Sequence, residues 1–251
     1  RTQKLRESNQ ALKERQKASL KIQDQKEELA NKNKNITDSI NYAHRIIEAM
    51  MPTEKAFHKV LPESFLLSMP KDIVSGDFYW IAEKNEKIFV AAVDCTGHGI
   101  PGAFMSIIGF DLLRNIIEIE GIDEPAEILN KLDEGVAQTF VGAEDMELSD
   151  GMDLSFCVID TKMNYLEFAG AMNPLYLIRD NNILEFQGDR ISVGNKDEGT
   201  NKHFSNQRIP LQKDDVIYLF SDGFPDQFGG PKGKKFKYRR FRHLLLTIHK
   251  L

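Results

Sequence analysis

The stretch of sequence that decides the fold lies at residues 88–101 and reads IFVAAVDCTGHGIP. Its first six residues are apolar, and several are β-branched or aromatic, which is typical of a buried strand. Asp94 follows directly, two glycines then bracket a histidine, and Pro101 opens an apolar helical pattern. The stretch therefore predicts a buried strand that ends in a carboxylate, then a glycine-rich turn, then a helix.

Two further segments also place an aspartate beside an apolar run. Residues 75–77 (SGD) precede FYWIA, and residues 221–223 (SDG) follow VIYLF. Taken singly, such Asp-Gly and Gly-rich pairs are more often ordinary turns. Taken together, three aspartates next to strands supply the oxygen ligands that Mg²⁺ and Mn²⁺ prefer, and the glycines leave room for a phosphate. The combination predicts a carboxylate site for two metal ions that activate a water molecule.

These motifs resemble the bacterial SpoIIE/RsbU branch of the metal-dependent serine/threonine protein phosphatases (PPM). The resemblance rests on residues 71–80 (KDIVSGDFYW), 94–103 (DCTGHGIPGA) and 218–223 (YLFSDG), and it continues through 150–156 (DGMDLSF) and 169–175 (AGAMNPL). It covers about residues 52–250. It implies an α+β fold in which two antiparallel sheets pack face to face as a β-sandwich flanked by helices, with the metals at one end.

The resemblance also implies the roles of individual residues. Asp94 would bridge two Mn²⁺ or Mg²⁺ ions, and Asp222 would hold one of them. Asp77 would ligate the other ion together with the backbone carbonyl of Cys95. Asp153 is an additional candidate ligand, although a strand-edge aspartate next to a turn is the more ordinary interpretation. The implied reaction is hydrolysis of phosphoserine or phosphothreonine on a regulatory protein, often an anti-sigma factor antagonist.

Two departures from the family pattern leave alternatives open. Eukaryotic relatives carry a histidine two residues after the bridging aspartate, whereas here Thr96 stands there and His98 follows. His98 would protonate the leaving alkoxide, or it would only hydrogen-bond within its loop. The family's last metal-binding aspartate lies in a terminal Asp-Asp-x-Thr strand, and no such segment follows Asp222, so the domain is interpreted as lacking its C-terminal strand.

Two other functions compete with an active phosphatase. One is a phosphatase-like binding module with weak or no catalysis, which the missing aspartate favours. The other is a different two-metal enzyme such as a nucleotidyl cyclase, which would require parallel βαβ units. The loops 160–164 (DTKMN) and 179–182 (RDNN) have hairpin composition, so the neighbouring strands are predicted to be antiparallel and the cyclase ranks last.

The secondary-structure pattern after Pro52 consists of strands with two inserted helices. The helices are predicted at 101–120 and 125–140. The strands are predicted at 65–69, 77–82, 87–94, 153–160, 165–171, 175–179, 183–186, 203–209 and 215–221.

Residues 1–51 form a separate unit without glycine or proline. With Leu5 at heptad position a, nine of fourteen a and d sites are apolar, and Lys26 and Asn33 are polar a sites. This pattern favours a two-stranded parallel coiled coil, hence a homodimer, over a single solvated helix. We therefore predict a coiled-coil signalling helix at 1–51 that controls a phosphatase domain at 52–251.

Composition limits the setting and the partners. The 251 residues are 41% hydrophobic with a net charge of −5, which argues against nucleic acid as a partner, and the basic stretch 232–242 is interpreted as a solvated loop and helix face. The two cysteines lie in apolar runs and indicate reduced core thiols. The sequence has no run of 18 apolar residues and no secretion signal. We expect no membrane segment and a cytoplasmic location, with tethering through an upstream sensor or membrane domain as a further option.

Overall fold

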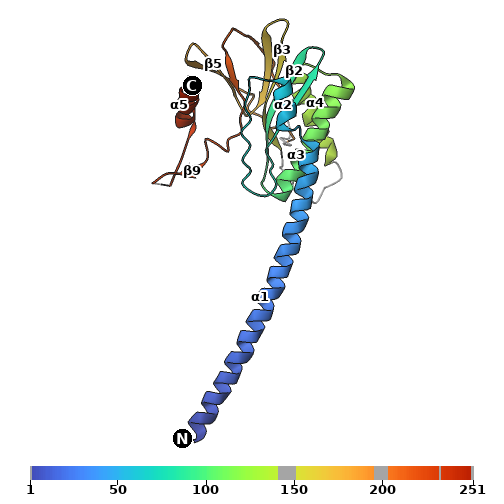
Figure 1. Ribbon diagram of the computed structural model, residues 1–251. Coiled ribbons are helices and arrows are strands. Elements are labelled where there is room, and N and C mark those ends of the chain that lie inside the picture. The colour runs from blue at the N-terminus through green and yellow to red at the C-terminus, as the bar shows by residue number, and fades with distance from the viewer. Residues whose placement is uncertain (1, 141–150, 195–202, 232, 250–251) are drawn as a thin grey trace. The chain divides into compact units, whose positions relative to one another are not determined.

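The structure is a computed structural model (Figure 1), and it describes residues 2–140, 151–194, 203–231 and 233–249. The chain divides into two compact units, Arg1–Ile46 and Ile47–Leu251. The helices are α1 (Thr2–Met50), α2 (Glu54–Val60), α3 (Ile100–Arg114), the π-helical η1 (Asn115–Glu120), α4 (Pro125–Thr139) and α5 (Tyr238–Ile248). The strands are β1 (Phe78–Lys84), β2 (Lys87–Cys95), β3 (Met152–Asp160), β4 (Tyr165–Ala171), β5 (Leu175–Arg179), β6 (Asn182–Phe186), β7 (Gln207–Pro210), β8 (Val216–Tyr218), β9 (Phe228–Gly229) and β10 (Lys234–Lys235).

Two antiparallel sheets form the body of the second unit, and β9 and β10 form a separate two-stranded antiparallel sheet. The larger has the strand order β1-β2-β3-β4-β7 and the smaller has the order β6-β5-β8. The predicted antiparallel α+β fold is therefore confirmed. All ladders between the strands of the described part of the chain are antiparallel, so the βαβ units that a cyclase would need do not occur there.

Three apolar clusters separate four layers of this unit. The first lies between the five-stranded sheet and α3 and α4, and it includes Phe89, Leu129 and Phe156. The second lies between the two sheets. The third packs Phe241 and Leu245 of α5 against the outer face of the smaller sheet. Figure 1 shows the resulting order, with α5 on one side of the two sheets and α3 and α4 on the other.

Tight hairpins connect neighbouring strands where the sequence predicted them. Asp180 and Asn181 both have positive φ angles, of 50° and 59°, which is the conformation of a two-residue type I′ turn. Asn164 has a φ of 51° at the end of the loop between β3 and β4. Asp160 stabilises that loop because its carboxylate accepts hydrogen bonds from the backbone N–H groups of Lys162 and Met163. These turns set the register of the strands that they join.

Three predicted strands differ from the structure, at 65–69, 203–209 and 215–221, and the last of these is observed only over Val216–Tyr218. Residues 65–69 have no strand structure, and the side chains of Phe65, Leu67 and Met69 are exposed. Their apolar composition is like that of a strand, but Pro62 and Pro70 flank the segment and lack the N–H groups that a ladder requires. The strand predicted at 203–209 begins only at Gln207, where pairing with β4 starts.

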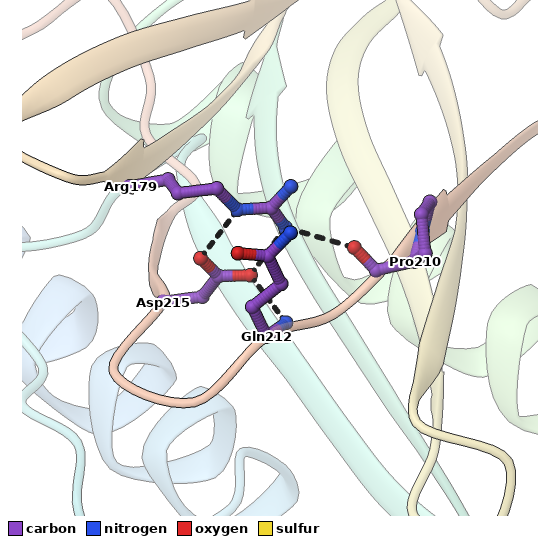
Figure 2. Close-up of polar contacts among 4 residues, drawn as sticks. All are labelled: Arg179, Pro210, Gln212 and Asp215. Carbon is purple, nitrogen blue, oxygen red and sulfur yellow. Dashed lines mark hydrogen bonds and ion pairs between the residues drawn. The ribbon is translucent and has the colours of Figure 1, made fainter.

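A buried ion pair closes the end of the sandwich where β7 leaves the larger sheet and β8 enters the smaller one (Figure 2). Arg179 of β5 donates to both carboxylate oxygens of Asp215, at 2.8 and 2.6 Å, and to the Pro210 carbonyl at 2.8 Å. The Gln212 backbone N–H donates to the same carboxylate at 2.8 Å. Hydrogen bonds from Arg179 lower the pKa of Asp215. This bidentate clamp fixes the connection between the sheets.

The N-terminal helix α1 runs without interruption from Thr2 to Met50, across the boundary between the two units at Ile46. Ile22, Leu29 and Ile36, which are predicted d positions, have exposed side chains in this single chain. The predicted heptad positions Leu5, Ser8 and Leu12 lie outside the residues whose side chains are described. These exposed apolar side chains are the ones that the predicted coiled coil would cover.

One helical stretch in the described part of the chain, Ile100–Glu120, is long and apolar enough to cross a membrane by length and composition alone. Leu113, Ile116 and Ile117 of this stretch are at most 3% exposed because they pack in the core against the larger sheet. The core of the domain therefore accounts for the apolar character of this helix. The helix predicted at 101–120 is observed as α3 followed directly by η1.

Gly170 of β4 is predicted to tolerate no side chain. A Cβ atom there would lie 2.4 Å from the Asn173 carbonyl oxygen and 2.9 Å from the Gly188 Cα atom, and neither backbone can move freely. We expect Gly170→Ala to lower the free energy of unfolding by about 1–3 kcal/mol, measured by urea denaturation. Gly229→Ala is the matched control, because a Cβ there would meet no atom within 4 Å. Equal losses in the two variants would contradict this account of the packing.

Candidate metal-binding site

The strand register brings three aspartates to one end of the larger sheet. Asp94, near the end of β2, lies directly opposite Asp153 at the start of β3. Phe78 is opposite Val93, so Asp77, which precedes β1, reaches the same end. Directly opposite residues project their side chains to the same face of a sheet. Val93 and Cys95 pack with α3 and α4, so the alternation of β2 turns Asp94 toward the other sheet.

The smaller sheet contributes Asp222 to the same place. β8 ends at Tyr218, and the chain continues through Ser221 to this aspartate. The Ser221 hydroxyl donates a 2.7 Å hydrogen bond to Oδ2 of Asp77, which ties the two sheets together at this end. Asp77 and Asp222 are exposed, whereas Asp94 and Asp153 are half-buried. The site therefore opens to solvent with its innermost carboxylate on β2.

Burial, together with charge repulsion, raises the pKa values of carboxylates in this cluster. Burial raises the pKa of Asp94 to about 7, and the neighbouring Asp77, Asp222 and Asp153 carboxylates add to the shift. Burial is also the largest cause that raises the pKa of Asp222, followed by Asp226 and Asp77. The pKa of Asp153 is raised by burial, although a 2.5 Å hydrogen bond from the Ser192 hydroxyl opposes the shift. The cluster thus concentrates negative charge that a cation would relieve.

The donors present match a hard divalent cation. They are carboxylate oxygens, with the Cys95 backbone carbonyl beside them, and such oxygen ligands suit Mg²⁺ and Mn²⁺. Among the described residues, no group of three or more His, Cys, Asp and Glu side chains is placed closely enough to hold a metal ion by itself. Mg²⁺ usually keeps several waters and uses only one or two carboxylates, so an open, water-completed site fits this arrangement.

Close packing of glycine-containing loops shapes the floor of the site. A Cβ on Gly76 would lie 3.1 Å from the Cys95 carbonyl oxygen, and one on Gly102 would lie 2.6 Å from the Gly97 carbonyl oxygen. These contacts let the segment before Asp77 lie directly against the loop after Asp94. The Cys95 thiol itself is free and buried, and burial raises its pKa far above the ordinary range. Only the backbone of Cys95 is therefore suited to face an ion.

His98 lies in the loop between β2 and α3 with an exposed side chain. Its Nδ1 atom is 2.9 Å from Oδ2 of Asp72, so this carboxylate orients the imidazole ring. Thr96, at the position where eukaryotic relatives carry histidine, instead hydrogen-bonds the backbone of Gly151 through its hydroxyl. Of the motif at 150–156, Asp150 lies outside the described residues.

The sequence patterns did not single out three residues that shape the site. Asp72 lies five residues before Asp77 within the quoted motif, and its pairing with His98 depends on two loops that meet only in space. Ser221 is next to Asp222 in the sequence. This adjacency was the signal that could have placed Ser221 at the site, where it bonds Asp77. Ser192 reaches Asp153 from a distant loop, and no local pattern marks it.

The comparisons with known proteins agree with this fold. A family model described as Stage II sporulation protein E (SpoIIE) matches residues 84–251. Phosphoserine phosphatase RsbU of Bacillus subtilis (strain 168) is 25% identical over 192 residues, which cover 75% of this chain and 53% of that protein. The chain thus spans about half the length of this curated relative.

Two solved structures have a similar fold. The SiaA-PP2C domain of Pseudomonas aeruginosa has 34% sequence identity and a TM-score of 0.75, over 85% of this chain and 82% of that one. The RsbU and RsbW domains of a Mycobacterium tuberculosis protein share the fold with a TM-score of 0.55 and 20% identity, over 72% of this chain and 47% of that one.

The raised pKa of Asp94 predicts a specific pH dependence of stability in metal-free protein. The folded state holds this proton up to about pH 7, whereas the unfolded chain releases it near the ordinary value of 3.8. The folded state binds more protons in this window, so its contribution to stability decreases as the pH rises. We expect the thermal midpoint of the chelator-treated protein to fall between about pH 5 and about pH 8 by a few degrees more than that of Asp94→Asn.

Asp111→Asn is the control for this measurement, since Asp111 is an exposed residue of α3 paired only with Arg114 in the described part of the chain. Its pH dependence should match the wild type. If Asp94→Asn also matched the wild type, the carboxylate cluster would not be the source of the effect.

Proposed function

Because the chain belongs to the SpoIIE family, we propose that it is a metal-dependent phosphatase that hydrolyses phosphoserine or phosphothreonine on a regulatory protein. The family match confirms the resemblance that the motifs predicted. The observation that carries the proposal is the cluster of Asp77, Asp94 and Asp222, gathered from both sheets at one end of the sandwich.

The chain's own residues would hold two divalent ions at this cluster. Asp94, whose pKa is raised by burial and by the charges of Asp77, Asp222 and Asp153, is suited to bridge them. Asp77 and the Cys95 carbonyl would hold one ion, and Asp222 the other. Bound Mn²⁺ or Mg²⁺ would neutralise the phosphoryl oxygens and make water a better nucleophile. Ser221 orients Asp77 by its 2.7 Å hydrogen bond, and Ser192 orients Asp153 as an additional ligand.

His98 is proposed to protonate the departing serine or threonine oxygen. Its bond to Asp72 fixes the ring while the exposed side chain leaves Nε2 accessible to a bound substrate. An alkoxide is a poor leaving group, so a positioned acid should matter for a phosphoserine substrate. It should matter little for p-nitrophenyl phosphate, whose phenolate departs without a proton.

The substrate is proposed from the relatives. RsbU is named a phosphoserine phosphatase, which supports a phosphorylated regulatory protein, such as an anti-sigma factor antagonist, as the partner of this chain. The alternative is a phosphatase-like binding module with little or no catalysis. Activity measurements on the two kinds of substrate distinguish these possibilities.

The activity prediction uses p-nitrophenyl phosphate and a phosphoserine peptide, each with and without Mn²⁺. We expect metal-dependent turnover that falls at least about 100-fold in Asp94→Asn on both substrates, because a bridging ligand is lost. His98→Gln should slow hydrolysis of the peptide by roughly 100-fold and change that of p-nitrophenyl phosphate little.

Asp111→Asn again serves as the control, since it removes a carboxylate from an exposed helix position. It should retain full rates with both substrates. Absence of turnover in the folded wild-type chain with either substrate would favour the binding-module alternative. Equal effects of His98→Gln on both substrates would indicate that this histidine has only a structural role.

The N-terminal helix is proposed to form a parallel homodimer that controls the phosphatase unit. Its exposed d-position side chains, including Leu29 and Ile36, need a partner, and a second copy presents the same series. Lys26 and Asn33 at a positions would fix the register at some cost in stability. Because α1 continues past Ile46 into the second unit, a change in the coil has a continuous helix through which to act.

Leu29→Asp is expected to dissociate this dimer. A charged residue at a d position removes apolar burial from both helices, so sedimentation should shift from dimer to monomer and the phosphatase rate should change with it. Asn31→Asp adds the same charge two residues away at an exposed, outward heptad position and should remain dimeric. A monomeric wild type, or a dimer that survives Leu29→Asp unchanged, would rule out the coil.

A further inference from the structure

A strongly basic face lies in the C-terminal part of a chain whose net charge is −5. The stretch 232–242 contains seven lysines and arginines and no acidic residue. Lys232 lies outside the described residues, and the others are Lys234, Lys235, Lys237, Arg239, Arg240 and Arg242. Such local segregation of charge differs from a mixed surface and makes this stretch a candidate contact for an anionic partner.

Some of the basic side chains of α5 pack within the fold, and others are exposed to solvent. Its buried face packs Phe241 and Leu245 against the smaller sheet, and Arg242 contributes to this packing by pairing with Glu185 and donating to the Tyr176 hydroxyl at 3.0 Å. Arg239 and Arg240 are exposed instead. Within the described residues, neither guanidinium group has a hydrogen bond or an ion pair, so both are available to a ligand.

A shallow, open depression lies on the exposed side of α5. It has a volume of about 730 Å³ and is lined by Phe236, Arg239, Arg240, His243, Leu244 and Thr247. Apolar side chains therefore lie beside two free guanidinium groups. This combination suits an extended peptide, because the arginines pair with carboxylates in bidentate fashion and the apolar residues contact its other side chains.

Hydrogen bonds join this basic face to the carboxylate site. The backbone N–H groups of Phe236 and Lys237 donate to the Gln227 and Pro225 carbonyls, at 2.8 and 2.6 Å. The Asp226 N–H donates in turn to the Asp222 carbonyl at 2.9 Å. The Lys235 ammonium also pairs with the Asp226 carboxylate at 2.5 Å. The loop that follows Asp222 is thus held directly against the segment that begins the basic face.

We propose that this face binds an acidic segment next to the phosphorylated residue of the protein substrate. The proposal rests on the proposed function. A bound acidic segment would place the neighbouring phosphoserine near Asp222, and the arginines would offset the repulsion that the aspartate cluster exerts on an anionic substrate. Charge complementarity of this kind raises the association rate and selects among partners.

The test compares two phosphoserine peptides that differ only in their flanks, one rich in Asp and Glu and one with Asn and Gln instead. We expect the wild type, with Mn²⁺ at low salt, to prefer the acidic peptide by roughly tenfold in kcat/KM, and the preference to fall with added salt. R239Q/R240Q should remove most of this preference. Arg239→Lys/Arg240→Lys should keep part of it, because charge remains but bidentate pairing is lost.

K55Q/K59Q is the matched control, because it removes the same charge from two exposed positions of α2. It should keep the full preference. The proposal is overturned if R239Q/R240Q keeps the acidic preference, or if the control loses it equally. It is also overturned if the same arginines bind anionic vesicles or single-stranded DNA more tightly than the acidic peptide.

Two measurements distinguish a failure of the proposed phosphatase function from a failure of the docking proposal. Turnover of p-nitrophenyl phosphate reports on catalysis without a peptide flank. Fluorescence anisotropy with a labelled, unphosphorylated acidic peptide reports on docking without catalysis. An inactive chain that still binds this peptide through Arg239 and Arg240 would retain the docking face and lose only the phosphatase assignment.

Discussion

The mutual repulsion of aspartates at one end of the sandwich is the constraint on which the rest of the phosphatase unit depends. Burial raises the pKa of Asp94 to about 7 and the nearby Asp77, Asp222 and Asp153 carboxylates add to the shift, an arrangement that costs stability unless a cation is present. The surrounding structure maintains it through the β2–β3 register, the Ser221–Asp77 hydrogen bond and the close loops around Gly76. The core clusters provide the rigidity that this opposing charge requires.

The sequence predicted most of this arrangement because the relevant signals are local. Each signal lies within a few residues of the element that it predicts. Examples are the apolar run before Asp94, the helix after Pro101 and the hairpin residues Asp180 and Asn181. The predicted strand at 65–69 was wrong because its apolar composition carries no information on whether a neighbouring strand exists to pair with. Flanking prolines were the better signal there.

Contacts between distant segments could not be predicted in the same way. Asp72 and His98 are 26 residues apart, and Ser221 and Asp77 are 144 apart. Their meeting depends on how loops pack after the sheets have formed. The net charge of −5 did not predict how charge is distributed either. It is a sum over the chain, in which an aspartate cluster and the basic helix face that adjoins it are not seen separately.

The clamp between Arg179 and Asp215 has a mechanical consequence. Asp215 precedes β8 and Asp222 follows it, so the clamp and the carboxylate site lie at opposite ends of the same strand. The clamp end is held by a bidentate ion pair whose aspartate side chain is only 4% exposed, whereas an exposed hydroxyl–carboxylate bond joins the sheets at the other end. The two sheets are therefore held more firmly at the Arg179 end of β8 than at the end where the aspartates meet.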